Sequence, residues 1–484
     1  METHRRVGQW ACLLALGLAL SGCASWRAIP ALPLPVQQAL AKADMPESAL
    51  GIVAYPLDDP AQRLQRRADD SMQPGSTMKL VTAVVALDTL GATHRGRTDL
   101  LVDAPIRDGV LDGPLYLRGG ADAELDWGAL ATLLRRLRDQ HGLREIRGGL
   151  VVDRGLFNPS RLDIGQPPFD ETPEFPYNVI PDALLLNGNL LQIQLQADAA
   201  RIEARSFPAL PGLRVDASAM RLNERPCRDW EAEWQLPRVT QDASGVTVAL
   251  QGGFPRQCRI EQALNLVDRQ WLTAAALRQI WSELGGTLSG PELEGRTPAG
   301  ARVLATHLDR PLGELINGVM KRSDNPLTRL IYLRLGAASA QPGEDSAAAA
   351  ERRVKAWFQA QAIPVEGLVM DNGSGLSRAE RVTPRQMEAL LLALRSSRYA
   401  PELMASLPLA GVDGTLSRRL KGTAAEGRAR LKTGTLRNVV GLAGFVTDAG
   451  GRSWLLVALL NHEQASAKGR PVLDALAEWV ASQR

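Results

Sequence analysis

The sequence predicts a protein of mixed α/β (α+β) class that folds into more than one domain. Its 484 residues are more than one hydrophobic core usually holds. Stretches with apolar residues at helical spacing alternate with stretches of strand-like alternation. The balance of hydrophobic (45%) and charged (23%) residues is that of a globular protein. We therefore expect two or three domains in which helices pack on sheets.

The N-terminal segment, residues 1–22, is typical of a secretory signal. Two arginines precede an apolar core, residues 10–20, that is too short to span a bilayer. Residues 20–23, Leu-Ser-Gly-Cys, resemble the lipobox of bacterial lipoproteins, and Ala24 resembles the outer-membrane sorting pattern. We expect a periplasmic chain that begins at a lipidated Cys23 and is anchored to a membrane, the outer one in a Gram-negative bacterium. The alternative is an ordinary signal peptide and a soluble periplasmic product.

A short helix and a hairpin are expected next. Apolar spacing predicts a helix over 35–44, and alternation predicts strands over 49–55 and about 63–68. A Pro-Gly pair then interrupts the pattern, and apolar residues return at helical spacing after Ser76. We therefore place Ser76 in the first turn of a helix.

Ser76 and Lys79 are the first candidate catalytic pair. Because an α-helix repeats every 3.6 residues, Lys79 lies on the same face as Ser76, with its amine near the hydroxyl. The Ser76 N–H has no helical partner and can bind a developing oxyanion. Burial of Lys79 would lower its pKa until it can accept the serine proton. The alternative is an N-cap serine beside a solvated lysine.

The pattern changes after about residue 98. Strand-like runs at 100–102, 114–118 and 149–152 surround an amphipathic helix over 127–141, which predicts a small α/β unit. The proline-rich stretch 158–181 is expected to be a long irregular loop.

Alternation then returns at 191–195 and 246–250, which predicts a compact β-rich module, and a helix over 270–284 follows it.

Cys227 and Cys258 are the cysteines that remain if Cys12 is removed with the signal and Cys23 is acylated. In an oxidising compartment we expect them to form a disulfide that stabilises their segment by roughly 3–4 kcal/mol. Neither these cysteines nor the five histidines show ligand spacing, so no metal and no cofactor is expected.

Two helices, over 312–319 and 327–335, are expected around Ser323-Asp324-Asn325, where Pro326 forces a break or a new start. The small-residue stretch 336–350 is expected to be a mobile loop or a helix start, without an assigned function. Residues 371–375 form a tight loop.

The last part of the chain predicts a β-meander and a helix. A strand over 429–435 contains Lys432-Thr433-Gly434 and pairs with strands over 441–447 and 454–460. An amphipathic helix over 471–482 ends the chain.

Three short motifs therefore occur once each and in a fixed order: Ser76-x-x-Lys79, Ser323-Asp324-Asn325 and Lys432-Thr433-Gly434. Each is weak alone, but this set in this order is that of penicillin-binding proteins and serine β-lactamases.

Nearly the whole mature chain resembles the class C penicillin-binding proteins, the S13 family of D-alanyl-D-alanine carboxypeptidases/endopeptidases. The resemblance includes residues 371–378, 411–416 and 432–436, together with Tyr177-Asn178 and Leu185-Leu186-Asn187. About 250 residues separate the first two motifs, where this family inserts two extra domains and β-lactamases have far less.

The resemblance implies a penicillin-binding-protein/β-lactamase-like transpeptidase domain with two nested insertions. We expect this domain over 23–95 and 294–484, a small inserted α/β domain over 96–186 and 266–293, and an inner β-rich domain over 187–265.

The implied reaction is hydrolysis of D-Ala-D-Ala termini and of D-Ala-diaminopimelate cross-links in peptidoglycan stem peptides. Ser76 attacks the carbonyl and forms an acyl-enzyme, Lys79 accepts its proton and Ser323 passes a proton to the leaving amine. Asn325 holds Lys79 and the substrate amide. β-Lactam antibiotics are expected to be covalent inhibitors.

The third motif is expected to hold the substrate. Lys432 and Thr433 bind the substrate carboxylate, and Gly434 lets the substrate lie against the strand edge. The N–H of Thr435 is the second oxyanion donor.

Three further residues follow from the resemblance alone. Asp153, Phe157 and Arg378 are expected to line a pocket for the zwitterionic end of diaminopimelate, with Asp153 facing the ammonium and Arg378 the carboxylate. The alternative is that Asp153 terminates a strand and Phe157 packs in the core.

Other functional classes fit less well. Glu261 opens a Glu-x-x-Leu-Asn pattern of class A β-lactamases, but it precedes the second motif instead of following it. No G-x-S-x-G elbow supports a Ser-His-Asp hydrolase. A catalytically silent peptidoglycan sensor or scaffold lipoprotein remains the alternative function. The net charge of +3 includes no basic run that suggests nucleic-acid binding.

Overall fold

The structure, a computed structural model, describes residues 31–484. The predicted signal segment and Cys23 lie outside the described residues. Helices and several separate sheets confirm the α/β (α+β) class. No helix among residues 31–484 is both long and apolar enough to cross a membrane.

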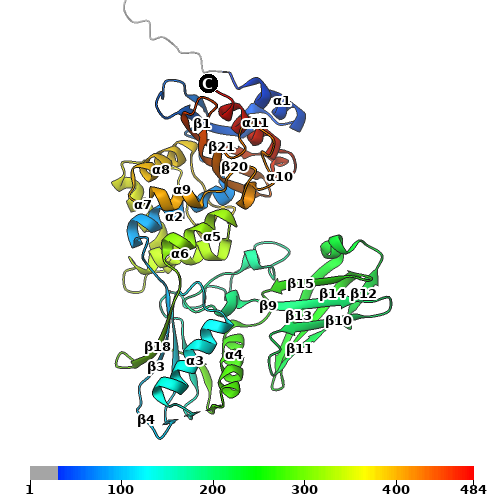
Figure 1. The fold of residues 1–484 in the computed structure, drawn as a ribbon, viewed down its shortest axis with the longest axis vertical. Coiled ribbons are helices and arrows are strands. Elements are labelled where there is room, and N and C mark those ends of the chain that lie inside the picture. The colour runs from blue at the N-terminus through cyan, green and yellow to red at the C-terminus, as the bar shows by residue number, and fades with distance from the viewer. Residues whose placement is uncertain (1–30) are drawn as a thin grey trace, which may run out of the picture.

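A five-stranded sheet forms the centre of the part that carries both chain ends of the fold (Figure 1). Its order is β19-β20-β21-β1-β2, so the N-terminal hairpin extends the predicted C-terminal meander. The strands are β1 (Leu50–Pro56), β2 (Leu64–Arg66), β19 (Ala429–Leu436), β20 (Val439–Thr447) and β21 (Ser453–Asn461).

Strand alternation gives this sheet two apolar faces, because successive side chains point to opposite sides. Leu50 and Ile52 belong to a core with α1 (Leu34–Ala43) and α11 (Arg470–Ala481). Val53 and Tyr55 belong to a second core with the remaining helices of this part. These helices are α2 (Lys79–Leu90), α5 (Leu312–Lys321), α6 (Asn325–Ala337), α7 (Ser346–Ala360), α8 (Pro384–Ser396) and α9 (Ala400–Ser406). The short α10 (Ala465–Lys468) precedes α11.

A second five-stranded sheet, ordered β17-β8-β6-β3-β18, lies below the helical layer in Figure 1. It packs with α3 (Trp127–His141) and α4 (Arg269–Glu283) in a separate core. Its strands are β3 (Arg97–Val102), β6 (Leu115–Gly120), β8 (Leu150–Asp153), β17 (Glu292–Glu294) and β18 (Arg302–Leu308). A small sheet, ordered β16-β7-β5-β4, adjoins it and contains β4 (Ile106–Arg107), β5 (Val110–Leu111), β7 (Glu145–Ile146) and β16 (Thr287–Leu288).

The pairing of β18 bears on the expected domain division. β18 lies antiparallel to β3 over its whole length, although the sequence division put residues 294–484 in the penicillin-binding domain. This pairing favours a return to that domain after β18. The division itself stays a prediction.

The β-rich region lies beside the second sheet and away from the first (Figure 1). It contains a sheet ordered β10-β9-β15 and a sheet in which β14 pairs with β11, β12 and β13. The strands are β9 (Leu191–Ala197), β10 (Ile202–Phe207), β11 (Leu213–Asp216), β12 (Met220–Asn223), β13 (Trp234–Asp242), β14 (Gly245–Pro255) and β15 (Arg259–Leu264).

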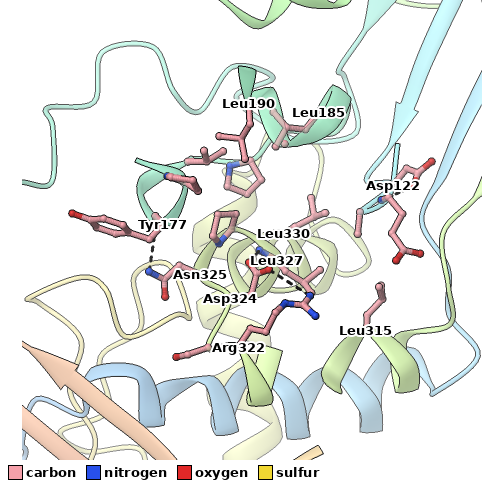
Figure 2. Close-up of a pocket in the computed structure, with 18 of the residues that line it drawn as sticks. Asp122, Tyr177, Leu185, Leu190, Leu315, Arg322, Asp324, Asn325, Leu327 and Leu330 are labelled. Atoms are coloured by element: carbon pink, nitrogen blue, oxygen red, sulfur yellow. Dashed lines mark hydrogen bonds and ion pairs between the residues drawn. The ribbon is translucent and has the colours of Figure 1, made fainter. Parts of the chain in front are cut away.

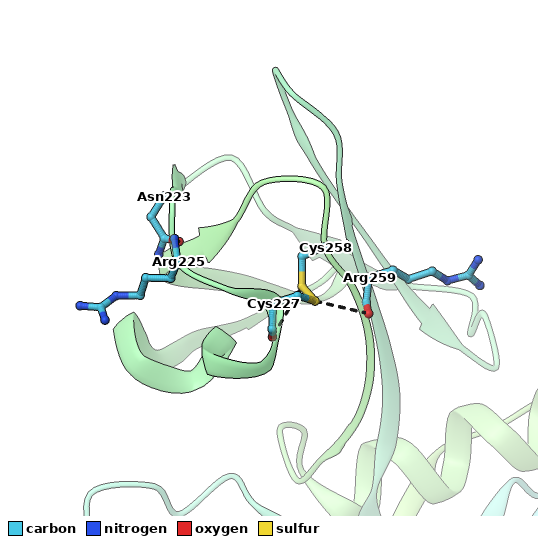
Figure 3. The surroundings of a disulfide bond; sticks show 5 residues. All are labelled: Asn223, Arg225, Cys227, Cys258 and Arg259. Atoms are coloured by element: carbon cyan, nitrogen blue, oxygen red, sulfur yellow. Dashed lines mark hydrogen bonds between the residues drawn. A yellow bond between two sulfur atoms is a disulfide. The ribbon is translucent and has the colours of Figure 1, made fainter.

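A disulfide joins Cys227 and Cys258 in this region, with 5.2 Å between their Cα atoms (Figure 3). Cys227 opens the 3₁₀ segment η5 (Cys227–Glu233), and Cys258 immediately precedes β15. The bond therefore ties the segment between β12 and β13 to the edge of the neighbouring sheet.

Candidate active site

Ser76 lies where a 3₁₀ turn, η2 (Gly75–Met78), leads into α2. The turn puts Lys79 one helical turn after Ser76, as the spacing predicted. Lys79 Nζ lies 3.0 Å from Ser76 Oγ. Ser76 is partly exposed, whereas the Lys79 side chain is fully buried. The nucleophile candidate is therefore accessible and its neighbouring amine is shielded from water.

The Lys79 amine contacts three acceptors. Besides Ser76 Oγ, it donates to Asn325 Oδ1 at 2.6 Å and to the Ser374 carbonyl. Burial lowers the pKa of Lys79 to about 7, although the carboxylates of Glu380 and Asp324 raise it, and the guanidinium of Arg329 lowers it further. An amine with this pKa is in part neutral near pH 7 and can accept a proton.

Lys432, on β19, is the second buried lysine. Its Nζ donates to Ser323 Oγ at 2.9 Å and to the Thr433 carbonyl at 2.7 Å. Burial and the charge of Lys79 lower its pKa well below the usual value. Ser323 has a φ of 58°, a left-handed conformation that is costly for a serine, in the turn between α5 and α6. The turn thus presents the Ser323 hydroxyl to Lys432.

Asn325 connects Lys79 to the long irregular loop over 158–181. Its Oδ1 accepts from Lys79, and its Nδ2 donates to the Tyr177 carbonyl at 3.2 Å. Figure 2 shows this contact at one end of a cavity of about 420 Å³ that residues 323–326 help to line. The loop over 158–181 therefore reaches the site.

Gly434 lies directly against the serine turn. A Cβ added to Gly434 would come within 2.6 Å of the Pro74 carbonyl oxygen and 3.1 Å of the Ser76 nitrogen. The sequence predicted a role for Gly434 in substrate access. In the structure, the backbone of the serine turn already leaves no room for a side chain at position 434. Thr433 Oγ1 lies 2.7 Å from Thr415 Oγ1, and Thr435 is exposed.

Sequence reasoning missed one buried carboxylate of the site. Glu380 is fully buried and accepts from the backbone amides of Asp371, Asn372, Gly373 and Gly375, the loop that carries the Ser374 carbonyl. A glutamate in a polar stretch is usually exposed, so the sequence gives little reason to expect that Glu380 is buried. The one feature that could have indicated it is the tight Gly-rich loop just before it.

The three residues expected around diaminopimelate lie in different surroundings. Arg378 lines a cavity of about 370 Å³, and its guanidinium carbon lies 5.2 Å from the centre of the Phe169 ring. Asp153 and Phe157 are not among the described residues that line this cavity, whose walls are Gln73, Arg378, Leu436, Arg437, Asn438 and Glu463.

Asp153 and Phe157 already have partners. The Asp153 carboxylate accepts from the amides of Gly155 and Thr297, at 2.9 Å and 2.8 Å. Phe157 is buried in a small apolar cluster with Leu330 and Leu333. This geometry matches the alternative of a strand end and a core aromatic. Their predicted contact with substrate stays a prediction.

Between residues 31 and 484, no group of three or more His, Cys, Asp or Glu side chains is arranged to hold a metal ion.

Comparisons with known proteins identify the family of this chain. A model of the D-Ala-D-Ala carboxypeptidase 3 (S13) family matches residues 34–483. A D-alanyl-D-alanine carboxypeptidase from Actinomadura sp. (strain R39) is 30% identical over 442 residues, which cover 89% of this chain and 81% of the relative. The D-alanyl-D-alanine carboxypeptidase DacB of Haemophilus influenzae is 31% identical over 400 residues, covering 81% and 80%.

The fold is similar to a crystal structure of penicillin binding protein 4 (dacB) from Haemophilus influenzae. The TM-score is 0.78 at 25% identity, with 93% of this chain and 99% of that chain covered. A second structure of that protein, complexed with a novel β-lactam, has a TM-score of 0.74.

Proposed function

Because the chain belongs to the D-Ala-D-Ala carboxypeptidase 3 (S13) family, we propose that Ser76, Lys79, Ser323, Asn325 and Lys432 are its catalytic residues. The protein is a serine-type D-Ala-D-Ala carboxypeptidase, a hydrolase of the penicillin-binding class. The silent sensor or scaffold alternative is therefore set aside. The observation that carries the residue assignment is the 3.0 Å contact between Lys79 Nζ and Ser76 Oγ in a buried setting.

Acylation begins when neutral Lys79 takes the proton of Ser76 Oγ and the oxygen attacks the carbonyl of the penultimate D-alanine. The amides of Ser76 and Thr435 bind the oxyanion. The Thr435 amide lies close to the serine turn, since a Cβ on Gly75 would be 3.2 Å from its nitrogen, and this supports the role. The leaving amine receives a proton through Ser323, whose hydroxyl contacts Lys432. Water then hydrolyses the acyl-enzyme.

The edge strand β19 binds the substrate carboxylate in this proposal. Lys432 and Thr433 are buried in the middle of β19, and Lys432 Nζ contacts Ser323 Oγ. Among residues 31–484, Lys432 has no carboxylate partner within 4.0 Å. A substrate carboxylate would supply that partner and favour the charged amine.

We further propose that the enzyme also cleaves D-Ala-diaminopimelate cross-links and that Arg378 reads the zwitterionic diaminopimelate end. One of the two cavities that Arg378 lines is also lined by Arg437 and Glu463, so it offers charges of both signs just beyond Thr435. Glu463 supplies the negative charge there that the sequence argument gave to Asp153.

The chain is expected to work at the cell wall in the periplasm, with peptidoglycan stem peptides as substrates and β-lactams as covalent inhibitors. The signal pattern and the Leu-Ser-Gly-Cys sequence support a lipid anchor on Cys23 in the outer membrane. Replacing Cys23 by Ala should move the protein from the membrane fraction to the soluble periplasmic fraction. Unchanged membrane association would remove the anchor from the account.

The reaction is tested with two purified substrates, a stem pentapeptide ending in D-Ala-D-Ala and a cross-linked dimer, followed by mass analysis. We expect loss of one D-alanine from the first and cleavage of the second into monomers. Cleavage of the pentapeptide alone would remove the endopeptidase activity. A Ser76→Ala variant that still releases D-alanine would remove Ser76 as the nucleophile.

A further inference from the structure

We infer that Glu380 is a positioning residue for Lys79: its buried carboxylate fixes the loop over 371–375, whose Ser374 carbonyl contacts the amine, and places a negative charge near it. The inference rests on the proposed role of Lys79 as the base. It adds a residue outside the three motifs to the machinery.

The carboxylate holds the loop through backbone amides only. Oε1 accepts from Asp371, Asn372 and Gly373, at 3.3, 3.1 and 2.6 Å, and Oε2 accepts from Gly375 at 2.6 Å. In the described part of the chain no cationic side chain lies within 4.0 Å of Glu380, which is fully buried. A buried charge without an ion pair is costly, and amide donors alone offset that cost here.

The same loop is fixed to the catalytic helix. Gly373 O accepts from Thr82 Oγ1 on α2 at 2.6 Å, and Lys79 donates to the Ser374 carbonyl. A Cβ on Gly375 would fall 1.8 Å from the Gly75 carbonyl oxygen, so the loop lies against the serine turn. A change in the carboxylate that shifts this loop therefore shifts an acceptor of the base.

The charge of Glu380 also acts on the amine. Burial raises the pKa of Glu380 to about 6, while the loop amides lower it and Asp371 raises it, so the group is mainly ionised near pH 7. The other charged or titratable groups near the pair are Asp324, Arg329, Tyr332 and Lys432. An anion favours the ammonium form of Lys79, so its removal lowers the pH at which Lys79 becomes neutral.

A purely structural role would not move that pH. Replacement of Glu380 by Gln keeps the shape and removes the charge, and the new amide N–H₂ cannot accept from Gly375 as the carboxylate does. Glu388→Gln is the matched control, because Glu388, on α8, is also a buried carboxylate but contacts Arg63 and Tyr55 instead of the loop over 371–375.

The experiment measures the rate of acylation by a fluorescent penicillin between pH 5 and 9. For Glu380→Gln we expect the acid limb to move to lower pH by roughly 0.5–1 unit and the plateau to fall about tenfold, while Glu388→Gln keeps the wild-type profile. An acid limb that stays in place, or a wild-type plateau, would overturn the inference.

A second variant covers the case in which Glu380→Gln does not fold. Glu380→Asp keeps the charge but cannot reach all four amides, so we expect an unmoved acid limb and a lower plateau. A wild-type plateau in Glu380→Asp would contradict the positioning role. The proposed function is tested separately by Ser76→Ala: labelling that persists there overturns the function, whereas a wild-type Glu380→Gln profile overturns only this inference.

Discussion

Gly434 and Ser76 touch through their backbones: a Cβ placed on Gly434 would lie 3.1 Å from the Ser76 nitrogen. The β19 backbone therefore packs directly against the serine turn. A change in the strand at Gly434 is expected to shift the proposed nucleophile.

Replacing Gly434 by Ala should slow penicillin acylation about 100-fold, because the methyl group displaces the serine turn and a shift of about 1 Å costs that much rate. Gly300→Ala is the control, since nothing lies within 4 Å of a Cβ at Gly300 and its backbone is not left-handed. The measurement is the labelling rate of both variants at equal thermal stability. Wild-type labelling by Gly434→Ala would show that the contact is not needed.

The pH dependence of acylation should follow Lys79. Its folded-state pKa of about 7 lies below the usual value of 10.5 because it is buried, so the neutral base is lost as the pH falls through about 7. The acylation rate should fall about tenfold for each pH unit below that point. A rate that stays constant from pH 8 down to 5 would assign the base to a group of lower pKa.

The low pKa of Lys79 also predicts a stability effect. A lysine that is more easily deprotonated in the folded state binds fewer protons there than in the unfolded chain, so stability should rise with pH between about 7 and 10.5 for this group. Lys79→Met should remove that rise while abolishing acylation. Unfolding by urea at pH 7 and pH 9 measures both proteins, and an equal pH dependence in the two would contradict the buried, mainly neutral amine.

Lys432→Met should remove the preference for a free terminal carboxylate. We expect kcat/KM for a D-Ala-D-Ala peptide to fall about 30-fold or more, with a much smaller loss for the same peptide amidated at its C-terminus. Lys355→Met on the surface of α7 is the control, since Lys355 forms an ion pair with Glu351 on its own helix. Equal losses on both peptides would mean that Lys432 acts on the chemistry and not on the carboxylate.

Arg378 and Asp153 should behave differently. Arg378→Met should lower cleavage of diaminopimelate-containing peptides about tenfold relative to peptides without that group. Asp153→Asn should leave this preference unchanged and lower the melting temperature, because its carboxylate accepts from two backbone amides. A changed preference in Asp153→Asn would restore its expected role at the substrate.

Local sequence signals predicted the helices and the strand that carry the candidate site. The helical spacing of Ser76 and Lys79 and the strand that holds Lys432 are present as expected. The helix expected over 127–141 coincides with α3. These features depend on residues near one another in the chain, where periodicity is informative.

The features that the sequence did not indicate depend on contacts between residues that are far apart in the chain. The contact between β18 and β3 joins residues about 200 positions apart, and no local pattern in the sequence indicates it. Glu380 is expected from the sequence to be exposed, whereas in the structure it is fully buried among the loop amides. Asp153 matched a family position, but its partner Thr297 comes from a segment that no local pattern places beside it.

Mass analysis of peptides from benzylpenicillin-treated protein shows which side chain carries the acyl group. We expect one adduct, on the peptide that contains Ser76, and none in Ser76→Ala protein that is folded by circular dichroism. An adduct on another peptide, or one that persists in Ser76→Ala, would rule out Ser76 as the nucleophile.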